Sequence, residues 1–204
     1  MDSKIIQSHF DDLFPEPKCE LEYKNNYELL VAVILSAQCT DKRVNIITKE
    51  LFKDFGTPEK MLSLSREKLE EKIHSCGFYR NKAKNILSMS RDLVDKYNGQ
   101  VPSTPEELQT LAGVGRKTAN VVYAEAFKGD AIAVDTHVLR VSNRLGFVKT
   151  ENPYECERAL MNKFDKSSWG KLHLQMVHFG RYICKAQKPE CDKCPFIEMC
   201  TTNK

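Results

Sequence analysis

Apolar residues in this chain recur at the three- and four-residue spacing of an α-helix along almost the whole sequence. That spacing places apolar side chains on one face of each helix, where they can pack against other helices. The Asn98-Gly99 pair resembles a hairpin turn but suits the end of a helix better. Two of the apolar stripes are Ile86, Leu87, Met89, Leu93, Val94 and Tyr97, and Trp169, Leu172, Met176, Val177, Gly180 and Ile183. The pattern predicts an all-α fold.

Capping signals mark where some of these helices begin and end. Thr104-Pro105-Glu106-Glu107 combines an N-cap threonine, a proline at the first helical position and a carboxylate three residues after the cap. Asn152-Pro153-Tyr154-Glu155 repeats this start signal. We expect Gly56 and Gly99 to end helices in the left-handed conformation that glycine adopts readily.

Two apolar segments are ambiguous, because β-branched residues favour strands. The first contains Val31, Val33 and Ile34, and the second contains Ile132 and Val134. Periodicity does not separate a short buried strand from a buried helix. Since no hairpin turn separates alternating runs here, we expect a helix for the first segment and an extended loop for the second.

Composition excludes several classes of protein. The chain has 204 residues, and its charged fraction of 29% is ordinary for a folded protein. The longest apolar run, residues 29–35, is far shorter than the roughly 20 residues that span a bilayer. The N-terminus lacks the features of a secretory signal, so we expect a cytoplasmic protein without a membrane segment. The net charge of +3 does not by itself predict a nucleic-acid partner, which must depend on local placement of basic residues.

A glycine-rich turn connects the helix that begins after Thr104 to the next one, in Leu-Ala-Gly-Val-Gly-Arg-Lys at residues 111–117. Gly113 and Gly115 allow a sharp hairpin whose backbone N–H groups, at a helix N-terminus, suit a phosphate. The alternative is a plain connector between two helices. Lys117 follows in the first helical turn beside Arg116, where two positive influences disfavour its protonated form. A neutral lysine amine is a nucleophile that can form a Schiff base, and an ordinary phosphate-binding lysine is the alternative.

An acidic residue stands where an apolar stretch gives way to a new helix, in Val134-Asp135-Thr136-His137. Asp135 is a candidate N-cap and also a candidate catalytic carboxylate, and one side chain can serve both purposes. His137 is either a structural residue or a DNA contact.

Four of the eight cysteines gather near the C-terminus with the spacing Cys184-x6-Cys191-x2-Cys194-x5-Cys200. In a reducing compartment we expect free thiols or metal ligands rather than disulfides. Four thiolates can bind zinc or an iron–sulfur cluster, and the spacing leaves both open. The other four, Cys19, Cys39, Cys76 and Cys156, lack ligand spacing and are expected to be small core residues.

Residues 111–127 and 134–137 resemble the helix-hairpin-helix motif and the catalytic aspartate loop of the endonuclease III family. The resemblance extends from Leu29 to Cys200, and it implies that Lys117 is the nucleophile and Asp135 its partner. The chain has Ala112 where the family usually has proline. Without the proline the turn is less preorganised in the unfolded chain, which costs about 1 kcal/mol or less of folding free energy.

The resemblance assigns further residues. It implies that Cys184, Cys191, Cys194 and Cys200 hold a [4Fe–4S] cluster, which orders a loop whose lysines can face DNA or be ordinary solvated charges; these are Lys185, Lys188 and Lys193. An enzyme that acts on a base inside duplex DNA must extrude that nucleotide, which leaves a gap in the base stack. The resemblance points to Gln38 and to the loop at residues 77–82 as the parts that fill this gap. Phe78 occupies a position where the family often has leucine, so it is either a DNA wedge or a core aromatic. The expected DNA contacts are Gln38, Phe78, Gly113, Val114, Gly115, Arg116 and His137.

The resemblance also implies two helical domains with a DNA groove between them: a six-helix barrel over residues 19–130, with the helix-hairpin-helix at 104–127, and an iron–sulfur domain over 1–18 and 131–204. The implied function is base excision repair by a monomeric bacterial or archaeal protein at the nucleoid. It would act on double-stranded DNA as an N-glycosylase for damaged pyrimidines and as an AP lyase through a lysine Schiff base. A monofunctional glycosylase on the same scaffold and a non-catalytic DNA-binding module are the alternatives.

Overall fold

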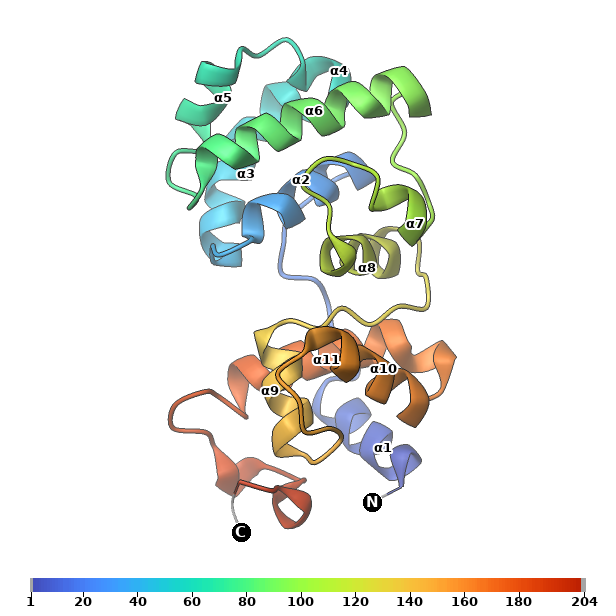
Figure 1. The fold of residues 1–204 in the computed structure, drawn as a ribbon. Coiled ribbons are helices and arrows are strands. Elements are labelled where there is room, and N and C mark those ends of the chain that lie inside the picture. Colours follow the sequence, from blue (N-terminus) through green and yellow to red (C-terminus); the bar gives the residue numbers. More distant parts are fainter. Residues whose placement is uncertain (1, 203–204) are drawn as a thin grey trace. The chain divides into compact units, whose positions relative to one another are not determined.

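The computed structural model describes residues 2–202, which form eleven α-helices and three 3-10 helices (Figure 1). The α-helices are α1 (Ser3–Leu13), α2 (Asn26–Ser36), α3 (Asp41–Phe55), α4 (Pro58–Met61), α5 (Arg66–Lys72), α6 (Tyr79–Tyr97), α7 (Pro105–Leu108), α8 (Arg116–Ala126), α9 (Thr136–Arg144), α10 (Pro153–Lys163) and α11 (Trp169–Tyr182). The 3-10 helices are η1 (Lys166–Ser168), η2 (Cys191–Lys193) and η3 (Ile197–Met199). No strand occurs between residues 2 and 202, so the all-α prediction is confirmed. None of the helices in this range has both the length and the apolar character needed to cross a membrane.

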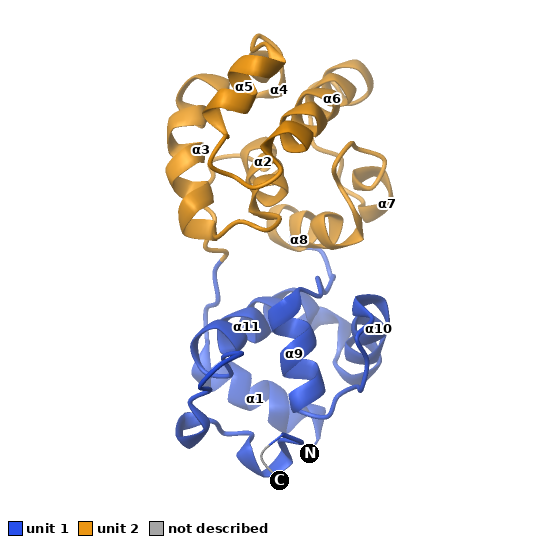
Figure 2. Cartoon of the chain, turned by 60° about the vertical axis from the view of Figure 1, so that its left-hand side comes forward, with its two compact units in different colours: residues 1–18, 128–204 blue, residues 19–127 orange. Residues whose placement is uncertain are grey.

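The chain divides into two compact units, which are coloured separately in Figure 2. Unit 1 consists of residues 1–18 and 128–204, and unit 2 consists of residues 19–127. Each unit has its own cluster of buried apolar side chains. Unit 1 is discontinuous in sequence, because α1 packs against α11 from the other end of the chain.

Helix α2 is the centre of the unit 2 core. Its residues from Tyr27 to Leu35 are all buried, so no stripe of this stretch faces solvent. It packs on α3, α6 and α8. A helix that is apolar all round is a buried helix. The β-branched residues at 31, 33 and 34 therefore reflect burial, and the helix expected for this segment is confirmed.

Three phenylalanine rings from distant parts of the sequence meet in the unit 1 core. Phe196 lies 4.9 Å from Phe10 and 5.4 Å from Phe179, measured between ring centroids, and all three side chains are fully buried. Burial of each such ring contributes roughly 1.5–3 kcal/mol. The contacts anchor the C-terminal loop, which carries the last cysteines, to α1 and α11.

A buried segment without regular secondary structure lies between α8 and α9 in the sequence. Ala131, Ile132, Ala133 and Val134 are buried and have no regular secondary structure, which confirms the extended loop expected there. The segment delivers Asp135 to the start of α9.

Both predicted helix starts and both predicted helix ends are confirmed, and one of the two glycines has the predicted left-handed conformation. The Thr104 hydroxyl accepts the N–H of Glu107 at 3.3 Å, and the Asn152 side chain accepts the N–H of Tyr154 at 2.9 Å. Gly99 has φ +75° and its N–H donates to Leu93 O at 2.8 Å. Helix α3 ends at Phe55 with Gly56 as its C-cap, as predicted, but the left-handed conformation predicted for Gly56 is wrong, because its φ is −82°. A β-carbon there would lie 2.6 Å from a carboxylate oxygen of Glu28 and 3.1 Å from Phe52 O, so a larger residue would require these groups to shift.

Candidate functional site

The glycine turn between α7 and α8 forms a tight hairpin in unit 2. Gly113 has φ +81°, and a β-carbon there would lie 2.9 Å from Cβ of Asn85, so only glycine fits without strain. Val114 is buried, and its N–H donates to Leu111 O at 3.1 Å. Gly115 is the N-cap of α8, where no side chain accepts the helical N–H groups, and the space around its α-carbon is open. The first turn of α8 therefore presents donors suited to an anion.

Lys117 lies in this first turn, and its side chain is exposed to solvent. The turn contains no acidic residue that would pair with an amine. Lys117 and its neighbour Arg116 thus place positive charge beside the hairpin donors. The arrangement can bind a phosphate and can bring an amine to the atoms next to it.

Asp135 is the N-cap of α9 in unit 1. Its Oδ1 accepts the N–H groups of both His137 and Val138 at 2.8 Å. The expected capping role is therefore present, and it fixes the orientation of the half-buried carboxylate. Because Lys117 belongs to unit 2 and Asp135 to unit 1, each is placed within its own unit.

His137 is half-buried, and its ring contacts an arginine that is also half-buried. Its Nδ1 lies 3.2 Å from Nη2 of Arg140, and that same guanidinium donates to Gly180 O at 2.7 Å and to Cys184 O at 3.1 Å. Burial lowers the pKa of Arg140 from its ordinary value. Sequence reasoning did not single out Arg140, which ties the start of α9 to the end of α11.

Gln38 and Phe78 lie on neighbouring turns of unit 2, after α2 and before α6. Both have left-handed backbone, with φ of 53° and 58°, although neither is glycine. A β-carbon on Gly77 would lie 3.7 Å from Gln38 O, so the two turns are in contact. Phe78 is 63% exposed, so the alternative of a core aromatic is wrong. Non-glycine residues with this backbone are strained, and such strain gathers at functional sites.

The cysteines without ligand spacing are small core residues, as expected. Cys76 and Cys156 are buried, and Cys19 and Cys39 are partly buried. The thiols of Cys39 and Cys76 lie 3.8 Å apart beneath the two turns.

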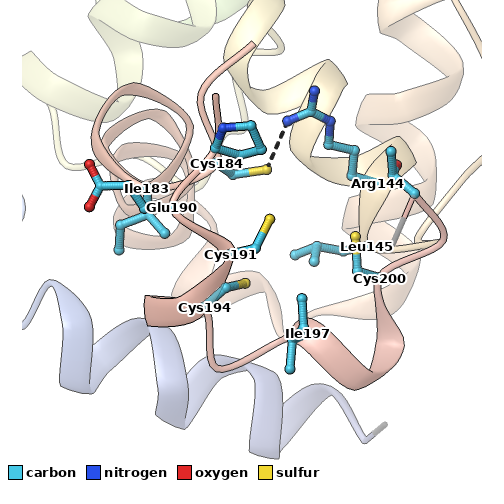
Figure 3. A pocket seen from close by; sticks show the side chains of 11 residues that line it. Arg144, Leu145, Ile183, Cys184, Glu190, Cys191, Cys194, Ile197 and Cys200 are labelled. Atoms are coloured by element: carbon cyan, nitrogen blue, oxygen red, sulfur yellow. Dashed lines mark hydrogen bonds between the residues drawn. The ribbon is translucent and has the colours of Figure 1, made fainter. Parts of the chain in front are cut away.

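The four C-terminal cysteines line one cavity in unit 1, with a volume of about 200 Å³. Figure 3 shows their side chains around this space, together with apolar Leu145, Ile183 and Ile197. Within residues 2–202, no three His, Cys, Asp or Glu side chains converge as ligands of a single metal ion.

Arginine and lysine side chains brace the cysteine loop. Arg144 Nη1 donates to Cys184 Sγ at 3.4 Å, drawn as a dashed line in Figure 3, and to Lys185 O at 2.7 Å. Lys185 and Lys193 both donate to Glu190, at 2.6 and 2.8 Å, and these hydrogen bonds lower the pKa of that carboxyl to about 2. Two of the three loop lysines, which the sequence left as either DNA contacts or ordinary solvated charges, are therefore ion-paired within the loop.

Comparison with known proteins places this chain among DNA repair proteins. Residues 31–166 match the family described as HhH-GPD superfamily base excision DNA repair protein. Endonuclease III of Bacillus subtilis is 50% identical over 190 residues, covering 93% of this chain and 87% of that protein. Endonuclease III of Rickettsia conorii is 49% identical over 203 residues, covering 98% of this chain and 97% of that protein.

Solved structures agree with the sequence relatives. A trapped endonuclease III–DNA covalent intermediate superimposes with a TM-score of 0.95 at 48% identity, covering 100% of this chain and 97% of that chain. A thermostable thymine-DNA glycosylase has the same fold, with a TM-score of 0.85 at 23% identity, covering 98% and 96%. At this identity and coverage, the chain belongs to the endonuclease III family within the HhH-GPD superfamily of base excision DNA repair proteins.

Proposed function

We propose that this chain is a base excision repair enzyme with two activities on double-stranded DNA. As an N-glycosylase it removes oxidised or otherwise damaged pyrimidines, and as an AP lyase it cleaves the strand 3′ to the abasic site by β-elimination. The observation that carries the proposal is the exposed Lys117 in the first turn of α8, two residues after the N-cap Gly115, in a chain of this family. Solved relatives 48% identical to the chain contain DNA, one of them as a covalent intermediate. We expect a monomer that acts in the cytoplasm, at the nucleoid.

DNA binding would begin at the hairpin. The N–H groups of the first turn of α8 hold a backbone phosphate and fix the register of the duplex without reading its sequence. Extruding the damaged nucleotide then costs a few kcal/mol of lost stacking and pairing. Gln38 and Phe78 are exposed side chains that can occupy the vacated space, the first by hydrogen bonds and the second by stacking.

The chemistry follows from the lysine amine. Nζ of Lys117 attacks C1′ of the deoxyribose, the C1′–N bond breaks, and the base leaves with the electron pair and takes up a proton. Opening of the sugar ring gives a Schiff base between C1′ and Nζ. A proton then leaves C2′ and the C3′–O bond breaks, so the strand on the 3′ side departs with a 5′ phosphate and the sugar keeps the new C2′–C3′ double bond. The Asp135 carboxylate would stabilise the positive charge that develops at the sugar and would assist these proton transfers.

We infer that Cys184, Cys191, Cys194 and Cys200 hold a [4Fe–4S] cluster. A zinc site would bring four sulfurs to about 2.3 Å from one ion, whereas the four thiolates of a cluster hold different iron atoms. A cavity of about 200 Å³ lined by all four thiols, without a group converging on one ion among the described residues, favours the cluster. When bound, it would cross-link the loop and hold its backbone in place, as structural metals do.

Borohydride trapping tests the catalytic proposal. The purified protein is incubated with a duplex that contains thymine glycol, borohydride is added, and a covalent protein–DNA adduct is sought by gel mobility. We expect an adduct with the wild-type protein and none with Lys117→Gln, because only the amine forms a reducible Schiff base. Lys128→Gln, which removes another exposed lysine near the end of α8, should behave like the wild type.

Three outcomes would redirect the proposal. Base release without an adduct would indicate a monofunctional glycosylase. Binding of DNA without base release or cleavage, in a protein that retains its iron, would indicate a binding module. An equal adduct yield from Lys117→Gln would move the nucleophile to another residue.

A further inference from the structure

Lys82 is a buried lysine that the mechanism above does not use. Only 5% of the residue is exposed, and it lies on the apolar stripe of α6 with Ile86, Met89 and Leu93. Burial lowers the pKa of its ammonium group from the ordinary value. A charged side chain in such a place is unfavourable unless it is well hydrogen-bonded.

The hydrogen bonds of this ammonium group all go to the end of α2. Nζ donates to Leu35 O at 2.8 Å and to Ala37 O at 2.7 Å. Carbonyls at a helix C-terminus lack partners within the helix, and a cation there is favoured by the helix dipole. Lys82 therefore caps α2 from a different helix.

The same residue is also bonded to the second turn. Its backbone N–H donates to Phe78 O at 3.1 Å, while its side chain holds the carbonyl of Ala37, the residue directly before Gln38. One residue is thus hydrogen-bonded to both turns that carry exposed, left-handed side chains. Strained backbone of this kind persists only where the surrounding structure holds it.

We propose that Lys82 is a positioning residue that fixes Gln38 and Phe78 relative to each other, so that both enter the DNA stack together when a damaged nucleotide leaves it. The inference rests on the proposed function, because it assigns these two side chains to the vacated space. Lys82 itself touches neither substrate nor reacting atoms. Its substitution should therefore affect the extrusion of a paired base, and not the chemistry that follows extrusion.

The test compares two duplexes under single-turnover conditions. The first has thymine glycol opposite adenine. The second has the same damaged strand opposite an abasic analogue, where no partner base is orphaned and less pairing is lost on extrusion. For each protein the ratio of the two cleavage rates is measured, and this ratio does not depend on the fraction of correctly folded protein.

Lys82→Met keeps the length and apolar stem of the side chain but removes its donors. We expect it to slow cleavage of the first duplex by about tenfold, the scale of losing hydrogen bonds from a charged donor, and to leave the second near the wild-type rate. Lys82→Arg retains donors and should recover part of the loss. Lys84→Met removes an exposed lysine from the same helix and should change neither rate.

A rate loss by Lys82→Met that is equal on both duplexes would mean a merely structural role and would overturn the inference. Unchanged rates on both duplexes would overturn it too. Wild-type protein that cleaves neither duplex would instead remove the proposed function, and the role of Lys82 with it.

Discussion

Replacing Gly113 by alanine tests whether the hairpin conformation is required for stability. A β-carbon at φ +81° is unfavourable by roughly 1–2 kcal/mol. It would also lie 2.9 Å from Cβ of Asn85, which no side-chain rotation can move away, and such overpacking adds roughly 1–3 kcal/mol. We therefore expect Gly113→Ala to lower the free energy of unfolding by about 2–5 kcal/mol. Urea unfolding followed by far-ultraviolet circular dichroism measures this loss.

Gly115→Ala is the matched control. Its β-carbon would meet no heavy atom within 4 Å, and its φ of −88° suits any residue, so the loss of stability should stay within about 1 kcal/mol. The added methyl group nevertheless stands where we propose that phosphate binds, so DNA affinity should fall. The two variants thus separate folding from binding. Equal loss of stability in both, or none in Gly113→Ala, would refute the argument from the left-handed turn.

Three further predictions concern other parts of the molecule. Asp135→Asn keeps an acceptor for the first turn of α9, so thermal unfolding should change by less than about 1 kcal/mol while strand cleavage is lost; Asp135→Ala should lose roughly 0.5–2 kcal/mol as well as cleavage. Removing iron with a chelator should lower the midpoint of unfolding reported by fluorescence of Trp169, the single tryptophan, which lies in unit 1 with the four cysteines; an unchanged midpoint would contradict a structural cluster. Tyr27→Phe should destabilise by about 1 kcal/mol at neutral pH, because the buried hydroxyl is hydrogen-bonded to Ser90. Burial raises the pKa of Tyr27 above its ordinary value of 10.0, so above pH 10 the tyrosine ionises in the unfolded wild-type chain before it does in the folded one, and the wild type loses stability. The difference in free energy of unfolding between the wild type and Tyr27→Phe, measured by urea unfolding, should therefore be smaller above pH 10 than at neutral pH.

Features encoded by neighbouring residues were predictable from the sequence. The N-caps Thr104 and Asn152 act on residues two and three positions away, and the left-handed stop at Gly99 is equally local. The hairpin at Gly113 and the capping by Asp135 belong to the same class. In each case a hydrogen bond or a left-handed residue within the segment itself defines the feature, so the local pattern was enough to predict it; the contact of Gly113 with Asn85 was not part of that pattern.

Features that depend on distant partners were not predictable in this way. Lys82 bonds carbonyls 45 and 47 residues away, and Arg140 reaches a carbonyl 44 residues away. The close approach of Gly56 to another group involves a carboxylate on a different helix, and the exposure of Phe78 depends on how unit 2 packs. The sequence did contain one indication for Lys82. It stands at a position of α6 that falls on the apolar face of the helix, so its side chain must either be buried or interrupt that face.

The phenylalanine cluster of unit 1 has a consequence for the order of folding during synthesis. All of unit 2 is made before Phe179 and Phe196 exist, and Phe196 follows the end of unit 2 by roughly 70 residues, which takes about 4–14 s at the usual elongation rate. Unit 2 can fold in that interval as one uninterrupted piece of chain. Helix α1 must wait throughout with Ile6 and Phe10 lacking their partners. A newly made chain therefore exposes the apolar face of α1 for several seconds, and this is the stage at which chaperone binding or aggregation would begin.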